Sequence, residues 1–211
     1  MFSGKKQHLI FKNFLKIRFL NNRGYSCSIC GHQFILFGIL LSALAIRIAF
    51  SIFIPLDYLA GDSAYYHFIA ENLSHGKGYS LNGIEPTYIR PPTYPAFMAL
   101  IHLVFGPNPK AVIYVQIVIG TITTLLTYFL ACRIFSKPAG LLAAFLVAFY
   151  PALIYYDNRI LRESLTALLL VTTVFFAIRS SQVGRSTWNI LITGTFLAVL
   201  SLCRVETLLL G

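Results

Sequence analysis

An acidic residue stands where an apolar run of the sequence ends. Asp62, in the segment AGDSAYYHFIAENL, follows directly on a long apolar stretch, at a point where lipid would give way to water. A carboxylate at such a position can accept a proton from an incoming hydroxyl group. An aspartate just before a helix is also an ordinary N-cap that satisfies free backbone amides, and capping does not preclude catalysis.

A basic residue precedes the next apolar segment. Arg90 is followed by two prolines, and a guanidinium held in this way is suited to bidentate hydrogen bonds with a phosphate. The common alternative is an arginine that snorkels to the membrane interface. A base and a phosphate-binding cation on one loop suit transfer of a group from a lipid-linked phosphate. Such a phosphate carries its departing charge well, so the site needs a cation opposite it more than a general acid.

Composition determines which elements can position these residues. Of the 211 residues, 57% are hydrophobic and 11% are charged, and the mean hydropathy is +0.72, which indicates an integral membrane protein. The excess of 17 Lys and Arg over 7 Asp and Glu does not indicate a nucleic-acid partner, because six of the cations precede the first apolar run in a segment without acids. We therefore expect a basic cytoplasmic segment over residues 1–33, no cleaved signal peptide, and a transmembrane domain over residues 34–211.

Apolar segments of about 20 residues can cross a bilayer. The segment from Pro92 to Phe105 has only 14 residues, which reach about 21 Å against a hydrocarbon core of roughly 30 Å, so we expect a partial helix that dips in from one side. With the N-terminus inside, this choice puts Arg133, Lys137, Arg179 and Arg185 on the cytoplasmic side and residues 56–91 outside. The predicted fold is an all-α, multi-pass bundle with spans at Phe34–Pro55, Ala111–Ala131, Pro138–Tyr156, Ile160–Ile178 and Trp188–Leu210.

The outer loop is predicted to contain an amphipathic helix that lies on the membrane surface. Between Ser63 and His75, helical spacing puts Tyr65, Phe68, Ile69 and Leu73 on one stripe, and Gly76 follows as an expected C-cap.

Three further charged positions are set by the same topology. Asp157 and Glu163 lie in or beside a turn that faces the outer side. Arg47 lies eight residues before Pro55, about 12 Å inside the outer boundary, so it should face the bundle or a wet cavity. Its structural alternative is a pair with a backbone carbonyl or a carboxylate.

The segment CSICGH contains Cys27, Cys30 and His32 at a spacing typical of zinc ligands. A closed zinc site needs four ligands and no second pair follows in the chain. We therefore expect two cytosolic thiols here and no metal site.

Five sequence segments, taken in chain order, resemble the N-terminal half of polyprenyl-phosphate-dependent glycosyltransferases of the GT-C fold. This group includes the protein O-mannosyltransferases and the bacterial aminoarabinose transferases. The resemblance runs from about residue 34 to 211, and its order and spacing are more specific than any one motif. The segments that carry it are YYHFIAENLSHGKGY after Asp62, RPPTYPAFMALIHLVFG, TYFLACRIFSKPAGLLAAFLVAFYPALIYY, RESLTALLL and CRVETLLLG.

The resemblance implies roles for individual residues. Asp62 matches the catalytic aspartate of the first outer loop, and Arg90 matches a basic residue near the lipid phosphate. Many relatives carry a second acid where this chain has Ser63, and often lysine at the position of Arg90. We favour Asp157 as the second carboxylate over Glu163, because Glu163 can pair with an adjacent arginine, Arg162 or Arg159. The other expected contacts to the donor are Arg204, as a second phosphate ligand, and Tyr65 and His67 beside Asp62.

We therefore expect an inverting transfer of a sugar from a polyprenyl phosphate to a glycan, lipid or protein acceptor on the outer face of a bacterial inner membrane. No cofactor is expected; a divalent cation is compatible with such chemistry but is not indicated. Relatives are usually much longer and the chain stops at Gly211 directly after VETLLL, so we expect a truncated domain that is inactive alone. Two alternatives remain: a transporter or lipid-handling protein without covalent chemistry, which needs polar groups near the bilayer midplane, and a structural membrane subunit.

Overall fold

The computed structural model describes residues 30–54, 57–182 and 187–204. Within these residues the chain is helical, and its only β-type pairing is an isolated bridge between Ser80 and Pro86. The helices are α2 (Cys30–Phe53), α3 (Asp62–Ser74), α4 (Thr93–Phe105), α5 (Pro109–Ile134), α6 (Lys137–Ala148), α7 (Pro151–Asp157), α8 (Glu163–Gln182) and α9 (Thr187–Cys203). The all-α prediction is confirmed.

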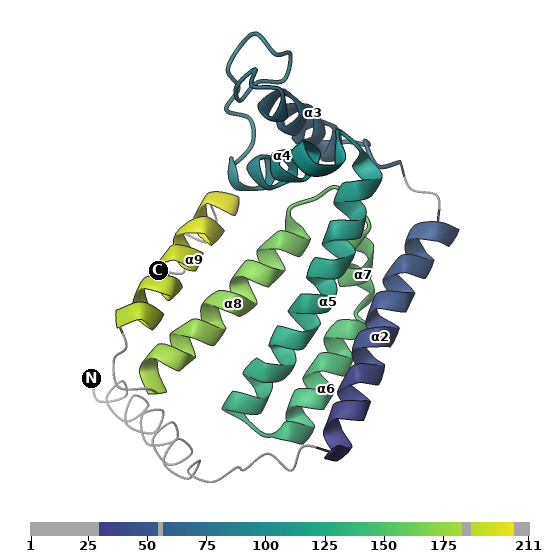
Figure 1. Cartoon of the computed structure of the whole chain (residues 1–211), viewed down its shortest axis with the longest axis vertical. Helices are drawn as coiled ribbons and strands as arrows, with labels where there is room; N and C mark the ends of the chain where they lie inside the picture. Colours follow the sequence, from purple (N-terminus) through teal and green to yellow (C-terminus); the bar gives the residue numbers. More distant parts are fainter. Residues whose placement is uncertain (1–29, 55–56, 183–186, 205–211) are drawn as a thin grey trace, which may run out of the picture.

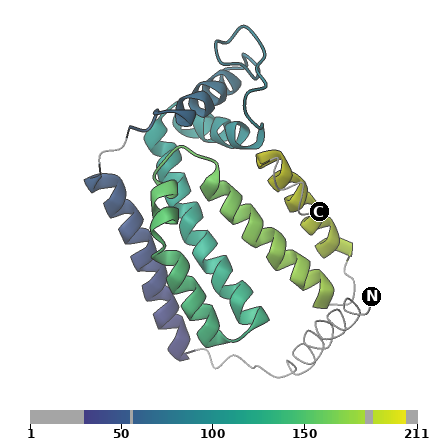
Figure 2. The same cartoon turned by 180° about the vertical axis from the view of Figure 1, so that it is seen from behind.

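The long helices form a bundle with α5 in a central position, where it packs against α2, α4, α6, α7 and α8 (Figure 1). Seen from behind, α8 and α9 again lie side by side, and α2 lies at the opposite edge (Figure 2). Many large apolar side chains point outward, among them Phe34 at 80% and Phe37 at 66% exposure. Such a surface is stable in lipid and not in water.

Three helices are long and apolar enough to cross a membrane: residues 32–53 of α2, α5, and residues 163–180 of α8. The predicted span Pro138–Tyr156 is instead two helices, α6 and α7, bent by 56° at a short break, and together they make a fourth candidate. Pro151 causes the break, because it has no backbone N–H to continue the ladder of α6 and it restricts the residue before it. The fifth predicted span begins as α9, of 17 residues; Arg204 follows the helix, and residues 205–210 of the predicted span lie outside those described.

The predicted short helix is present as α4, of 13 residues, and its entry into the membrane from one side stays a prediction. Helices α3 and α4 pack on each other and lie across one end of the bundle (Figures 1 and 2). The same end receives the C-terminal end of α9, where the hydroxyl of Thr93 donates to the carbonyl of Val199 at 3.5 Å. The turn between α7 and α8 also lies at this end (Figure 1). Segments that are far apart in sequence therefore meet here.

The helix predicted in the outer loop is present as α3, and its position on the membrane surface stays a prediction. Tyr65 and Phe68 of the predicted stripe are 41% and 46% exposed, whereas Ile69 is buried together with Tyr66 and Ala70. The reason is tertiary: α3 packs on α4 along a face rotated by about one residue from the expected stripe, so the position of α4 decides which residues are buried. His75 is the C-cap of α3, and Gly76 follows it at φ +73°.

Candidate active site

Asp62 and Arg90 meet at the end of the bundle where α3 lies. The Nη2 atom of Arg90 donates a hydrogen bond to Oδ1 of Asp62, which forms an ion pair between side chains that are 23% and 52% exposed. Asp62 is the first residue of α3, preceded by Gly61 as N-cap, and its side chain makes no capping hydrogen bond. The N-cap interpretation of Asp62 is therefore wrong. The expectation that the acid and the cation share one site is confirmed as geometry.

The guanidinium of Arg90 also lies over two aromatic rings, 5.3 Å from the ring centroid of Tyr65 and 5.6 Å from that of Tyr66. Tyr65, one of the predicted donor contacts, is thus part of the site. Cation–π contacts of this length hold a guanidinium in place while leaving its edge available for hydrogen bonds.

The backbone of Arg90 is held by Tyr79. The Tyr79 hydroxyl donates to the carbonyl of Arg90 at 2.8 Å, with a longer contact of 3.3 Å to that of Pro91. Tyr79 is itself fixed, because its carbonyl accepts from the backbone N–H of Thr87 at 2.9 Å. Burial raises the pKa of Tyr79 to about 12, so its hydroxyl stays a donor at neutral pH. The turn-rich loop after α3 is therefore a built support for Arg90.

Tyr66 lies where charges from three segments converge. Its ring is 2% exposed and packs edge-to-face on Tyr94 of α4, with centroids 4.9 Å apart. Burial raises the pKa of Tyr66; the charges of Arg162 and Arg90 oppose this effect, and those of Asp62 and Glu163 add to it. Two cations and two acids, from α3, the outer loop and the start of α8, thus act on one hydroxyl.

Several buried polar atoms on the elements that meet at this end of the bundle have no partner. Among the described residues, such atoms include Oγ of Ser63, Nε of Arg90, Nε of Arg159 and Oε2 of Glu163. Native proteins pair nearly all their buried polar groups, so unpaired atoms of this kind are expected where a ligand or water binds. The remaining unpaired atoms belong to His67, His102, Asn158 and Ser164, on α3, α4, the turn after α7 and the start of α8.

Arg204 reaches this end at the close of α9. The charges of Arg162, Glu163 and Arg204 all act on the buried thiol of Cys203, which contacts the hydroxyl of Thr166 at 3.5 Å. Arg204 therefore lies near Cys203 and the start of α8.

His67, another predicted donor contact, points elsewhere. It is 6% exposed and packs on His102 of α4, with ring centroids 5.2 Å apart, and its Nε2 is 3.9 Å from a carboxylate oxygen of Glu71. Burial lowers the pKa of His67, and Glu71 partly opposes this shift. The structure thus places His67 in the α3–α4 interface and not beside Arg90.

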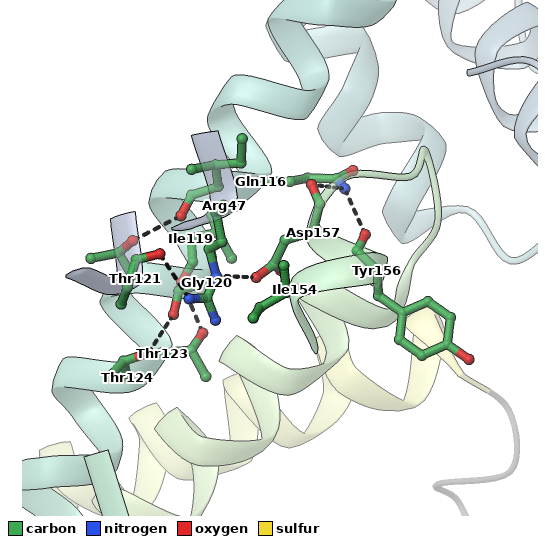
Figure 3. A network of polar contacts seen from close by, with 12 residues as sticks. Arg47, Gln116, Ile119, Gly120, Thr121, Thr123, Thr124, Ile154, Tyr156 and Asp157 are labelled. Carbon is green, nitrogen blue, oxygen red and sulfur yellow. Dashed lines mark hydrogen bonds and ion pairs between the residues drawn. The ribbon is translucent and has the colours of Figure 1, made fainter. Parts of the chain in front are cut away.

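Asp157 and Arg47 form a separate pair inside the bundle. Nε of Arg47 is 2.6 Å from Oδ2 of Asp157, and the two side chains are 0% and 2% exposed (Figure 3). The structural alternative for Arg47 is confirmed, and both of its expected partners, a carboxylate and backbone carbonyls, are present. Asp157 lies at the predicted end of the bundle, but its carboxylate is paired with Arg47.

Arg47 supplies hydrogen bonds to backbone carbonyls at the break between α6 and α7. Its Nη1 donates to the carbonyl of Ala148 at 3.0 Å and its Nη2 reaches that of Val147 at 3.5 Å. In an unbroken helix the carbonyl of Val147 would accept from residue 151, which is a proline without an N–H. Nη1 also donates to Ala43 of its own helix at 3.0 Å. Arg47 thus satisfies carbonyls that lipid could not.

Gly120 of α5 makes room for this pair, as Figure 3 shows. A Cβ atom added at Gly120 would lie 2.1 Å from Oδ2 of Asp157 and 2.9 Å from Nε of Arg47. Real Cβ atoms do not approach others so closely, so the pair depends on the absence of a side chain at this position.

Gln116, one turn before Gly120 on α5, connects α4 to the turn between α7 and α8. Its Oε1 accepts from the hydroxyl of Tyr94 on α4, and its Nε2 donates to the carbonyl of Arg159 at 2.6 Å (Figure 3 shows its contact to Tyr156). The helix that supports Tyr66 is therefore tied to the turn that precedes Arg162 and Glu163.

Sequence reasoning did not single out Tyr66, Tyr79, Gln116 or Arg162 as site residues. Arg162 was considered only as a partner of Glu163, although its charge next to an acid at the start of a span was a usable signal. Of the residues that could bind a metal, Cys27 lies outside the described residues, and within them no group of three or more acidic, histidine or cysteine side chains has the geometry to hold an ion.

The bundle of apolar helices is that of a membrane protein, and the family match below identifies it as a glycosyltransferase of the GT-C type. Residues 89–211 match the family described as dolichyl-phosphate-mannose-protein mannosyltransferase, and because this is more than half of the chain, the protein belongs to that family. Comparisons with curated proteins and with solved structures give no match. Arg90 lies within the matched residues, whereas Asp62 precedes them. The family's donor is a polyprenyl-phosphate-linked sugar.

Proposed function

We propose that the protein transfers a sugar from a polyprenyl phosphate to an acceptor hydroxyl with inversion at the anomeric carbon, and that Asp62 is the general base and Arg90 the phosphate ligand. The observation that carries this proposal is the Asp62–Arg90 ion pair, which brings the two groups together from opposite ends of the loop. Inversion in one step requires a base on one side of the anomeric carbon and a stabilised leaving group on the other.

The reaction follows from these positions. Asp62 takes the proton of the acceptor hydroxyl, the acceptor oxygen bonds to the anomeric carbon, and the bond from that carbon to the phosphate oxygen breaks. Its electron pair leaves with the polyprenyl phosphate. No external oxidant or reductant is needed, and the charge that develops on the phosphate faces the guanidinium of Arg90.

The ion pair also explains how the base is kept ready. Without donor, Asp62 and Arg90 neutralise each other, and Nε of Arg90 has no partner. A phosphate binds a guanidinium through two parallel hydrogen bonds. When the donor phosphate takes Arg90, the carboxylate of Asp62 is released to accept a proton. Donor binding therefore activates the base.

For the second carboxylate we now favour Glu163 over Asp157. Asp157 is 2% exposed and held by Arg47, whereas one carboxylate oxygen of Glu163 has no partner and its charge acts on Tyr66. Arg162 and Arg204 are further cations for the lipid phosphate or its sugar. The site end is proposed to face outward across a bacterial inner membrane, with residues 1–33 inside, since this places the basic turns in the cytoplasm.

The test uses the full-length protein, a set of polyprenyl-phosphate sugars and a measured rate of sugar transfer. Asp62→Asn should reduce the rate by about 10²–10⁴-fold, the usual contribution of a general base. Glu85→Gln, at another exposed carboxylate of the outer loop, is the matched control and should keep the parent rate. Transfer that survives Asp62→Asn would refute the base assignment, and retention of anomeric configuration in the product would refute the one-step mechanism.

A further inference from the structure

A second binding feature lies at the other end of α4. A groove with a volume of about 520 Å³ is formed where α4 ends and α5 begins, and it is lined by Phe105, Tyr114, Val115 and Val118, with Asn108 and Lys110 at its head. This volume is in the range of small-molecule sites, roughly 300–1,000 Å³. Nothing in the proposed transfer reaction uses these residues.

The apolar part of the groove is the outer face of α5. Ala111, Tyr114, Val115 and Val118 follow one another at helical spacing, on the face opposite to the buried Val112, Ile113 and Ile117. Tyr114 and Val118 are each 51% exposed and Phe105 is 61% exposed, so this face is covered by lipid in a membrane.

The head of the groove is cationic. Lys110 is exposed in the first turn of α5, and no carboxylate of the described residues is within ion-pair distance of it. Val118 lies eight residues further along, about 12 Å deeper by helical rise. The groove thus presents one positive charge at the end of the bundle and an apolar channel that runs from it toward the middle of the membrane. This pattern is complementary to an anionic lipid in its normal orientation, with the phosphate at the membrane surface and the acyl chains below it.

We propose that this groove binds an anionic phospholipid of the surrounding bilayer, with its phosphate on Lys110 and an acyl chain along Tyr114 and Val118. The sugar donor is a different ligand at a different place. Arg90 precedes the start of α4 and Lys110 follows its end, and the helix between them is about 18 Å long. One phosphate cannot contact both cations.

The bound lipid would brace the α4–α5 junction. The connection is only Gly106, Pro107 and Asn108, and Gly106 has φ +75°. A phospholipid in the groove packs against both helices at this corner and therefore supports the angle at which α4 crosses the end of the bundle.

The experiment places a fluorescent reporter in the groove. The full-length protein carries Tyr114→Trp with the native Trp188 replaced by Phe, and it is reconstituted in vesicles that mix phosphatidylcholine with phosphatidylglycerol. Quenching by brominated phosphatidylglycerol, compared with brominated phosphatidylcholine, gives the relative affinity of the two lipids at residue 114. A single interfacial lysine favours an anionic lipid by about fivefold.

The expected result is a preference of about fivefold for phosphatidylglycerol, which Lys110→Gln removes. Lys77→Gln, a matched loss of an exposed lysine on the loop after α3, should leave it intact. Val118→Phe, which narrows the groove without changing its charge, should weaken the binding of both lipids next to residue 114. Equal quenching by the two lipids, or equal effects of Lys110→Gln and Lys77→Gln, would overturn the proposal.

A final arm separates this site from the donor site. Polyprenyl phosphate is added as an unlabelled competitor. It should displace brominated phosphatidylglycerol no better than unlabelled phosphatidylglycerol does, and a much stronger displacement that Lys110→Gln abolishes would assign the groove to the donor and overturn the proposal. Because the readout is binding at residue 114, failure here leaves the test of Asp62 unaffected.

Discussion

The described residues form two arginine–aspartate pairs, and their surroundings differ in every respect that matters for chemistry. Arg47 and Asp157 are 0% and 2% exposed, and the guanidinium also serves carbonyls of α2 and α6. Arg90 and Asp62 are 23% and 52% exposed, and Nε of Arg90 has no partner. A pair whose hydrogen bonds are complete can only hold structure, whereas a pair with exposed and unpaired atoms can exchange its partner for a ligand.

The largest expected effect is on stability, at the buried pair. Asp157→Ala leaves the charge of Arg47 buried without its partner, which should destabilise the fold by about 3–5 kcal/mol. The corresponding change at the exposed pair, Asp62→Ala, should cost less than about 1 kcal/mol. Thermal unfolding of the two variants in the same detergent measures the difference. Replacing both buried partners, with Arg47→Met and Asp157→Leu, should restore part of the loss, and equal destabilisation by the two Asp→Ala changes would break the distinction.

Gly120 tests the same pair without changing a charge. Gly120→Ala puts a methyl group 2.1 Å from Oδ2 of Asp157, so the two side chains must separate, at an expected cost of about 1–3 kcal/mol. Gly194→Ala on α9 is the control, since nothing lies within 4 Å of its added Cβ and alanine is the better helix former. Unfolding midpoints should fall for the first variant and stay or rise for the second. The opposite order would show that the packing around Arg47 is not tight.

A change at Tyr79 tests whether the position of Arg90 in the exposed pair matters for donor binding. Tyr79→Phe removes the hydrogen bonds to the carbonyls of Arg90 and Pro91, worth about 1 kcal/mol. Because the hydroxyl positions Arg90, the KM for the lipid donor should rise severalfold with a smaller change in kcat. Tyr88→Phe, at a residue that is 91% exposed, should leave both constants unchanged. A loss confined to stability would make Tyr79 a structural residue only.

The smallest expected effect concerns pH and the α3–α4 interface. Burial lowers the pKa of both His67 and His102, so the folded protein binds fewer protons than the unfolded chain between those lowered values and about 6.5. The contribution of the neutral pair is therefore complete above about pH 7 and is lost as the pH falls below 6.5. The protection factors of the α3 amides, which correct the observed exchange rates for the pH dependence of intrinsic exchange, should fall as the pH is lowered from 7.5 to 5.5.

His102→Gln should flatten that pH dependence, because it removes one of the two buried imidazoles. The exposed His75 provides the control, and His75→Gln should keep most of the pH dependence, although its charge acts weakly on His102. Protection factors in α3 that do not change with pH in the parent protein would exclude a role for this pair.

Much of the fold was predictable because the length of an apolar run decides whether it can span a membrane. The 14-residue run at Pro92 predicted a short helix, and α4 has 13 residues. The break in the predicted span Pro138–Tyr156 was not predicted, although Pro151 was visible in the sequence. A proline alone does not show whether a helix kinks or separates, since that depends on what satisfies the freed carbonyls, and here Arg47 does so from another helix.

The sequence predicted on which side of the membrane the site residues lie. It did not predict which side chains contact each other. Counting the segments that cross the membrane was enough to put one set of residues at the same end of the bundle: Asp62, Arg90, Asp157, Glu163 and Arg204. The sequence allowed a carboxylate partner for Arg47 but did not identify Asp157, which lies 110 residues away. That contact decides that Asp157 is occupied and leaves Glu163 as the available acid. Tyr66 was missed because the buried face of α3 is set by α4, not by α3 alone.

The partnership of Arg47 with Asp157 has a consequence for biosynthesis. The helix that carries Arg47 emerges from the ribosome well before residue 157, so during that interval a guanidinium enters the bilayer without its counter-ion, at a cost of up to about 3 kcal/mol for a central position. Helix α2 therefore depends on later helices to become stable in the membrane. Nascent chains that stop before α7 should retain α2 poorly, whereas chains that include α7 and the last turn of α6 should integrate it fully.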